Sequence, residues 1–358
     1  MKIIDVTDPG KTDDLIAALA AADRIAVDTE FMREKTFYAQ LCLIQIATSK
    51  EIYCADPLTS SDLSRFWPTL NNCDWVLHSG RQDIEVFYQT ARQMPASVFD
   101  TQIAAGLLGY APQMGYATLV KELFGKELAK SHTRADWTRR PLSAEMLEYA
   151  AEDVEFLLDA CDKLSDRLTE LGRLTWAMED SNRLLDPALY DDNPPAAIDR
   201  LKGAGKLSGR ARNAATALST WREQRAINSN RPRQWILKDP VVLELAIKNP
   251  QDTTALTAIN GMPAVTARRS AKELLAVLAT AKEIDDGYRP PARPTETQKS
   301  LLKTMQAEVA AIADDLGISA ELIAPKKELS AAMLGECNSR VFTGWRRDIV
   351  GQRLLDRM

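Results

Sequence analysis

The sequence has few cysteines, and no two of them form a Cys-x-x-Cys pair. The five are Cys42, Cys54, Cys73, Cys161 and Cys337, spread over 358 residues. An odd and scattered set excludes a disulfide framework and a zinc site built on cysteine pairs. The sequence therefore favours a reducing cytoplasm as the place where this protein works.

Long apolar runs are absent as well. No stretch of about 18 apolar residues occurs, so no transmembrane helix is expected. The N-terminus, MKIIDVTDPGKTDD, becomes acidic before an apolar signal segment could form. No Walker A motif is present, which argues against a helicase, and no nucleotide cofactor is expected. Histidine occurs only at His78 and His132. We expect packing or hydrogen bonding for His78, and His132 lies in a polar loop.

Charge is plentiful but unevenly distributed. Residues 1–200 carry 20 Lys and Arg against 33 Asp and Glu, a net charge of −13. Residues 201–358 carry 25 against 17, a net charge of +8, and most of this excess lies in 201–290. An acidic body followed by a basic module suggests metal chemistry in the first and polyanion binding in the second. Unequal solvated surfaces that arose by chance are the alternative explanation.

The first hundred residues have the pattern of short strands separated by turns and helices. The expected strands are 24–31, 41–49, 51–57 and 75–80, and helical periodicity covers 60–70 and 82–92. The connection Ser49-Lys50 is so short that it requires a hairpin of antiparallel neighbours. From about residue 102 the sequence becomes mostly helical. These elements predict an α/β domain, a mixed sheet covered by helices.

Two turn-rich stretches divide the rest of the chain. Residues 184–209 and 285–298 are rich in Pro, Gly and Asp, whereas 218–226 and 241–249 have helical periodicity. Two small all-α units are therefore expected after the α/β body. The predicted boundaries are 1–190 for the α/β domain, 191–209 for a linker, 210–290 for the first helical domain and 296–358 for the second.

The most informative local pattern is Asp28-Thr29-Glu30 in the expected strand 24–31. Alternation along a strand places Asp28 and Glu30 on one face, roughly 7 Å apart along the backbone. Two carboxylates in an apolar strand are costly to bury unless a positive group compensates them. A divalent cation such as Mg²⁺ or Mn²⁺ does so, because it prefers carboxylate oxygen. A strand end that leaves into solvent explains the same residues without a metal.

Three further residues indicate a function only when they are considered together. Asp83 follows a strand end and Gly80, in the first turn of a helix, where the helix dipole favours an acid anyway. Tyr149 and Asp153 are four residues apart on a helix and share one face. Each feature alone is ordinary. Taken in order, the three motifs resemble those of the DEDD superfamily of 3′→5′ exonucleases, which has a ribonuclease-H-like fold, and Tyr149 places the sequence in the tyrosine subgroup.

The surrounding segments narrow the resemblance to the ribonuclease D family. LCLIQIAT (41–48), VFDTQIAA (98–105) and the stretch 131–154 look like that family in particular. The stretch 218–239, together with AINGM (258–262), resembles an HRDC domain, a small helical nucleic-acid-binding module. The family's layout is a catalytic domain followed by two HRDC domains. The second helical domain is assigned to this type by position and helicity.

The resemblance implies a two-metal phosphodiester hydrolysis. Asp28, Glu30 and Asp153 would hold the cation that activates water, Asp28 would bridge to a second cation about 4 Å away, and Asp83 would support that second cation. Tyr149 would orient the attacking water. The implied substrate is RNA with a free 3′ end, such as a tRNA precursor. The implied products are nucleoside 5′-monophosphates, and the protein is expected to be a monomer.

Candidate RNA-binding residues lie in two basic segments. The loop before the Tyr149 helix carries Arg134, Trp137, Arg139 and Arg140, a set suited to phosphate contact and base stacking, although Trp137 could equally be a core anchor. Residues 221–238 contain Trp221, Arg222, Arg225, Arg231, Arg233, Trp235 and Lys238. In the HRDC-like pattern some tryptophans belong to the core, and the arginines and Lys238 are the candidates to face RNA. Removing everything beyond about residue 200 is expected to weaken RNA binding while leaving some hydrolysis.

Two other functions are compatible with the same residues. A DNA-directed 3′→5′ exonuclease would use the same carboxylate motifs. A non-catalytic RNA-binding scaffold could retain the fold, although the presence of all four acids and Tyr149 argues against it. Hydrolysis assays on labelled RNA and DNA separate these alternatives.

Overall fold

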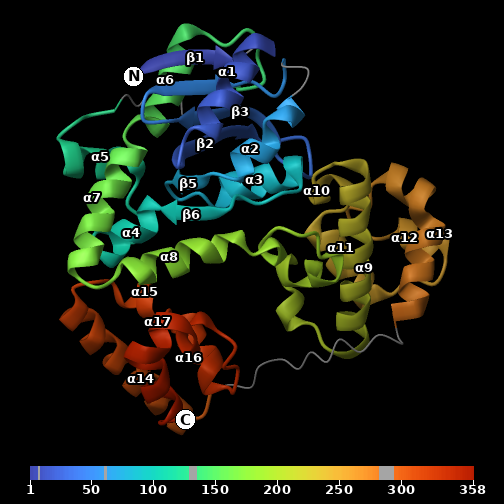
Figure 1. Ribbon diagram of the computed structural model, residues 1–358. Helices are drawn as coiled ribbons and strands as arrows, with labels where there is room; N and C mark the ends of the chain where they lie inside the picture. The colour runs from blue at the N-terminus through green and yellow to red at the C-terminus, as the bar shows by residue number, and fades with distance from the viewer. Residues whose placement is uncertain (7–8, 60–62, 129–134, 282–293) are drawn as a thin grey trace. The chain divides into compact units, whose positions relative to one another are not determined.

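The chain folds into two compact units, each of which is described by itself. The computed structural model describes residues 1–6, 9–59, 63–128, 135–281 and 294–358 (Figure 1). The first unit consists of 1–32, 41–190 and 294–358, and the second of 33–40 and 191–293. Among the described residues, none of the helices has the length and apolar character needed to cross a bilayer.

The first unit is built on a six-stranded sheet in the order β1-β4-β3-β2-β5-β6. β3 and β4 are antiparallel, as the Ser49-Lys50 connection predicted, and β1–β4, β2–β5 and β5–β6 are parallel pairs. The mixed sheet is thus confirmed. β1 and β6 were not predicted, so the strand expected to be first is in fact the second. The strands are β1 (Lys2–Val6), β2 (Arg24–Met32), β3 (Gln40–Ala47), β4 (Glu51–Ala55), β5 (Asp74–Leu77) and β6 (Ser97–Asp100).

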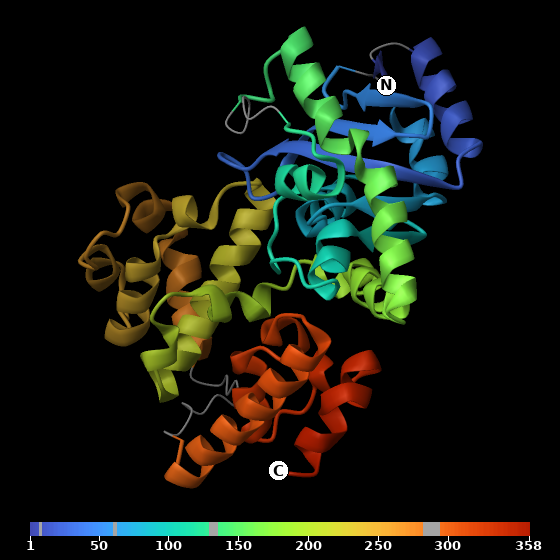
Figure 2. The same cartoon turned by 90° about the vertical axis from the view of Figure 1, so that its left-hand side faces the viewer.

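Helices from the middle of the chain pack on this sheet. α6 contacts β1, β2 and β4, and α7 contacts β2 and β5, so both helices cross the sheet near its centre (Figure 2). Ser143 caps the N-terminus of α6, since its hydroxyl accepts a hydrogen bond from the Met146 amide, and the helix buries Ala150, Ala151 and Val154. The helices are α1 (Pro9–Ala20), α2 (Trp67–Asn71), α3 (Arg81–Ala91), α4 (Thr101–Leu107), α5 (Tyr116–Phe124), α6 (Ala144–Glu155), α7 (Leu157–Glu170) and α8 (Leu174–Asn182).

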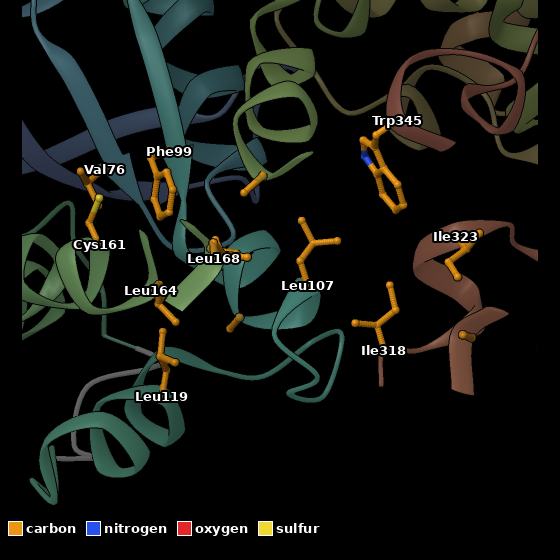
Figure 3. Packing of buried hydrophobic residues seen from close by; sticks show 14 of the residues in the cluster. Val76, Phe99, Leu107, Leu119, Cys161, Leu164, Leu168, Ile318, Ile323 and Trp345 are labelled. Atoms are coloured by element: carbon orange, nitrogen blue, oxygen red, sulfur yellow. The ribbon is translucent and has the colours of Figure 1, made fainter. Parts of the chain in front are cut away.

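The C-terminal helices belong to the same unit as the sheet. Leu107 and Leu168 lie in one buried cluster with Ile318, Ile323 and Trp345 (Figure 3). The indole of Trp345 also stacks on that of Trp176 in α8, with ring centroids 4.5 Å apart and nearly parallel planes. Residues 296–358 therefore share a core with the α/β body. Their helices are α14 (Glu296–Leu316), α15 (Ala320–Ile323), α16 (Lys326–Met333), α17 (Gly344–Arg346) and α18 (Gln352–Leu355), with a π-helical turn at Arg347–Gly351.

The second unit is helical around its own core. The predicted helices 218–226 and 241–249 correspond to parts of α9 and α11. The prediction that residues 191–209 form a linker was wrong. This stretch forms two 3₁₀ helices, η4 (Pro194–Arg200) and η5 (Ala204–Lys206), and contributes Ile198, Leu201 and Leu207 to the core. The α-helices are α9 (Gly209–Ser229), α10 (Arg233–Ile236), α11 (Asp239–Lys248), α12 (Thr253–Thr257) and α13 (Ala264–Thr280).

Candidate active site

Strand β2 supplies the first two acidic side chains. Asp28 and Glu30 alternate with buried Val27 and Thr29, so both carboxylates leave the strand on the same face, as predicted. Both are half-buried rather than fully exposed. The strand does not end in solvent here, because it continues to Met32. The metal-free explanation offered by the sequence therefore loses its structural basis.

Helix α6 brings a third carboxylate to the same place. Asp153 lies in the last turn of the helix, and the carboxylate oxygens of Asp28, Glu30 and Asp153 all lie within 4.8 Å of one another. Tyr149 is one turn earlier on α6, and both side chains are half-buried. Residues more than a hundred positions apart thus meet at one face of the sheet.

Asp83 completes the acidic set from a different direction. It lies in the first turn of α3, after Gly80, and it is 7% exposed. The Thr29 hydroxyl donates a hydrogen bond to Asp83 Oδ1 at 2.5 Å. Asp83 lies outside the group of three mutually close carboxylates, but its charge is close enough to raise the pKa of Asp28.

Two residues that hold Asp83 in place were missed by the sequence reasoning. Thr29 is one, through the hydrogen bond just described. Asp100 is the other: its carboxylate accepts hydrogen bonds from the amides of Ser79 (3.0 Å) and Gly80 (2.9 Å), which fixes the turn that precedes α3. It lies inside the segment VFDTQIAA, which was noted only for its resemblance.

Burial raises the pKa of every carboxyl in the site, and repulsion by neighbouring carboxyls adds to the effect. Burial is the main cause for Asp28, whose pKa lies well above its usual value, and Asp83, Asp153 and Glu30 add to it. Burial likewise raises the pKa of Glu30 to about 8, of Asp153 to about 7 and of Asp83 to about 6. No Lys or Arg among the described residues forms an ion pair with any of the four. Ionising all four carboxyls is therefore unfavourable without a cation, since no described basic side chain offsets their charge.

The donor set fits divalent cations. All the candidate ligand atoms are carboxylate oxygens, the donors that Mg²⁺ and Mn²⁺ prefer, and no cysteine or histidine is part of the group. His78 instead bonds Thr101 Oγ1 through Nδ1 and the Met114 carbonyl through Nε2, both at 2.9 Å. This matches the hydrogen-bonding role expected for His78.

The raised pKa values predict how stability depends on pH without metal. Because the folded carboxyls hold protons that the unfolded ones release, the folded state binds more protons between about pH 4 and pH 8. In chelator, the free energy of unfolding should fall as the pH rises through this interval. Urea unfolding of the wild type and of Asp153→Asn checks this, since the variant should show a shallower fall. Identical pH profiles for the two proteins would contradict it.

The loop before α6 acts as a brace for Tyr149. Trp137 is only 4% exposed and packs in a buried cluster with Tyr149, at a ring-centroid distance of 6.3 Å. Arg140 fixes this loop, because its guanidinium binds both Asp56 oxygens at 2.5 and 2.7 Å and donates to the Cys42 and Trp137 carbonyls at 2.7 Å. Of the two roles considered for Trp137, the structure shows the core anchor.

Several predicted RNA-facing residues are used by the fold instead. Arg222 is 1% exposed and binds Asp239 at 2.7 Å, so the structure contradicts an RNA-facing role for it, and buried Trp137 fits the core alternative. Arg140 is committed to Asp56, and half-buried Arg233 binds Glu223 at 2.9 Å. Arg134 and His132 lie outside the described residues. The predicted residues that remain exposed are Arg139, Arg225, Arg231 and Lys238.

Comparison with known proteins identifies the family. Residues 3–169 match a family model described as 3′-5′ exonuclease, and residues 211–278 match the HRDC domain. Ribonuclease D from Xanthomonas oryzae is 36% identical over 98% of this chain and 97% of its own length. The chain belongs to the ribonuclease D family. It is accordingly a 3′→5′ exoribonuclease, and catalysis in this exonuclease family depends on divalent metal.

Other ribonuclease D comparisons agree over the full length. Ribonuclease D from Acidiphilium cryptum is 37% identical over 96% of this chain and 91% of its own. The crystal structure of Escherichia coli RNase D, described as an exoribonuclease involved in structured RNA processing, matches with a TM-score of 0.90. It is 27% identical, and the match covers 100% of this chain and 98% of that one. The predicted ribonuclease-H-like body and the first HRDC domain are thereby confirmed.

Proposed function

We propose that this ribonuclease D family member uses two divalent cations, Mg²⁺ or Mn²⁺, to hydrolyse RNA from a free 3′ end. Nucleoside 5′-monophosphates are the products. The observation that carries the proposal is the meeting of Asp28, Glu30 and Asp153 within 4.8 Å, next to buried Asp83. Four carboxyls with raised pKa values, and with no ion pair to a basic residue in the described part of the chain, form a site that binding of cations would stabilise.

Each carboxylate has a proposed place in this chemistry. Asp28, Glu30 and Asp153 would hold one cation, Asp28 would also bind the second, and Asp83 would support the second from the α3 side. When bound, the cations stabilise the charge on the attacking and leaving oxygens of the scissile phosphate. The Thr29 hydroxyl keeps Asp83 oriented, and the brace formed by Trp137 and Arg140 keeps Tyr149 beside the carboxylates.

Tyr149 is proposed to orient the attacking water rather than to remove its proton. Burial and the neighbouring carboxylates raise the pKa of Tyr149 to about 12, so the phenol keeps its proton at neutral pH and can donate a hydrogen bond. Tyr149→Phe should therefore lower kcat about 10²-fold, with little change in the metal-induced rise in Tm. Steady-state kinetics and thermal unfolding check this, with exposed neighbour Glu148→Gln as control. A wild-type kcat in Tyr149→Phe would contradict the role.

The substrate proposed is structured RNA, with tRNA precursors as the first candidates. The Escherichia coli relative is described as acting in structured RNA processing, and residues 201–290 supply a basic module with 15 Lys and Arg against 8 Asp and Glu. Phosphate contacts would come from the exposed residues Arg139, Arg225, Arg231 and Lys238. Residues 296–358 are proposed as a second HRDC-like module, and the monomeric state and cytoplasmic location stay predictions.

One assay tests the proposed function against its alternatives. The purified chain is incubated with RNA and DNA of the same sequence, labelled at either end, in Mg²⁺, Mn²⁺ or chelator. The proposal expects mononucleotides from the 3′ end of RNA, only with metal, and none from RNA whose 3′ hydroxyl is blocked. Preferential release from DNA would favour the DNA-directed alternative. No release from either substrate, with RNA still bound, would favour the scaffold.

A further inference from the structure

Trp235 is the most exposed of the large apolar side chains in the described part of the chain. It is 61% exposed, whereas Trp221, fourteen residues earlier, packs against the core of the second unit. A single exposed apolar side chain is common and needs no explanation, so the residues around Trp235 decide whether it forms a binding site. The sequence left open which of the two tryptophans is structural, and the structure assigns that role to Trp221.

Trp235 lines a groove whose other charged residues are all basic. The groove has a volume of about 330 Å³, and its walls include Trp221, Arg225, Arg231, Val265 and Arg269, with no acidic residue among them. Arg225 pairs with Glu273 at 3.3 Å. Arg231 and Arg269 are exposed, and no ion pair to them occurs among the described residues. Two arginines that pair with no described acid thus flank the open indole, while Glu273 on α13 pairs with Arg225.

We propose that this groove binds single-stranded RNA, with one base stacked on the Trp235 indole and the neighbouring phosphates against Arg231 and Arg269. This inference rests on the proposed function and assigns its RNA contacts in the second unit to one groove. An indole face stacks on any base, which gives affinity without sequence preference. The guanidinium groups attract the phosphates on either side. All the residues that line the groove belong to the second unit, whereas the four carboxylates belong to the first.

The chemistry of the groove distinguishes single strands from other occupants. In a duplex the bases are already stacked and paired, so their faces are not available to an indole. A proline-rich peptide also binds grooves lined by aromatic residues, but it carries no negative charge to match Arg231 and Arg269, which form no ion pair among the described residues. A flexible single strand offers both a base face and phosphates.

Fluorescence anisotropy with the full-length chain in EDTA tests the proposal, because the chelator prevents hydrolysis. The probes are a 5′-labelled unstructured RNA of about 12 nucleotides and a blunt RNA duplex of equal length. Trp235→Ala should weaken single-strand binding about fivefold or more without affecting the duplex, and Trp235→Phe should restore much of it. Arg269→Ala should also weaken it, whereas Arg268→Ala, which removes an equally exposed charge outside the groove, should stay within about twofold of the wild type.

Wild-type affinity in Trp235→Ala would overturn the proposal, as would an equal loss on both RNAs. Equal effects of Arg268→Ala and Arg269→Ala would mean that diffuse charge, not the groove, binds RNA. Displacement of a labelled proline-rich peptide from the wild type but not from Trp235→Ala, with RNA affinity unchanged, would assign the groove to a protein partner. Hydrolysis by the wild type, measured in parallel with Mg²⁺, separates the two hypotheses: if RNA is degraded but Trp235 is irrelevant, only this inference fails.

Discussion

Replacing Asp28 with asparagine is expected to lower kcat for RNA hydrolysis at least about 10³-fold. Asp28 interacts with all three other carboxyls of the site, since the charges of Asp83, Asp153 and Glu30 raise its pKa in addition to burial. The uncharged amide would remove a ligand from both proposed cations. Single-turnover hydrolysis of a 3′-labelled RNA in saturating Mg²⁺ or Mn²⁺ measures the loss.

Although Asp28→Asn should lower activity, it should stabilise the metal-free protein. Removing one of several repelling charges should raise the Tm in chelator, while the rise in Tm on adding metal should shrink, since metal stabilises only through binding to the folded state. Asp23→Asn is the matched control, because Asp23 is exposed just before β2 and lies outside the carboxylate group. Undiminished metal stabilisation in Asp28→Asn would place the cations elsewhere, even if activity were lost.

The carboxylate site was largely predictable because its pattern is local in each motif. Strand alternation placed Asp28 and Glu30 on one face, and helical spacing placed Tyr149 and Asp153 together. That the motifs converge came from the resemblance, not from periodicity. Thr29 and Asp100 were not predicted, because a hydrogen bond such as the one from Thr29 to Asp83 joins residues 54 positions apart and leaves no periodic pattern.

The basic residues were harder to interpret, because composition does not distinguish a buried guanidinium from an exposed one. Arg222 and Arg231 look alike in the sequence, yet Arg222 is buried against Asp239 and Arg231 is exposed. The acidic partner makes the difference: Asp239 pairs with Arg222, and Asp56 pairs with Arg140. Arg140 and Asp56 are separated by 84 positions in the sequence, so only the folded chain shows that they pair.

The C-terminal boundary was obscured for a related reason. Turn-rich segments at 184–209 and 285–298 suggested independent modules, but Ile318, Ile323 and Trp345 share a buried cluster with Leu107 and Leu168. A chain that ends at about residue 200 would lose the C-terminal helices that complete this buried cluster, as well as the basic module. We therefore expect such a truncation to unfold the catalytic unit, so it cannot isolate the contribution of the basic module to RNA binding.

Arg346→Met should lower the free energy of unfolding of the first unit by about 3–5 kcal/mol. Arg346 is 1% exposed, binds both Asp180 oxygens at 2.5 and 2.7 Å and donates to the Leu322 carbonyl at 2.7 and 2.9 Å. Removing it leaves the Asp180 carboxylate, on α8 and 9% exposed, without its counter-charge. Because the sheet and the C-terminal helices share one core, the variant should lose its hydrolytic activity and its helical circular dichroism signal together. Both losses should occur at a lower urea concentration than in the wild type.

The controls separate this buried pair from surface charge. The double variant Arg346→Met with Asp180→Leu should regain most of the stability, since no charge is then left unpaired. Arg357→Met removes a half-exposed arginine that pairs with Glu308, and it should cost no more than about 1 kcal/mol. If Arg346→Met lowered the helical transition but left activity at its wild-type urea midpoint, the C-terminal helices would be an independent domain, and the shared core would not be a single cooperative unit.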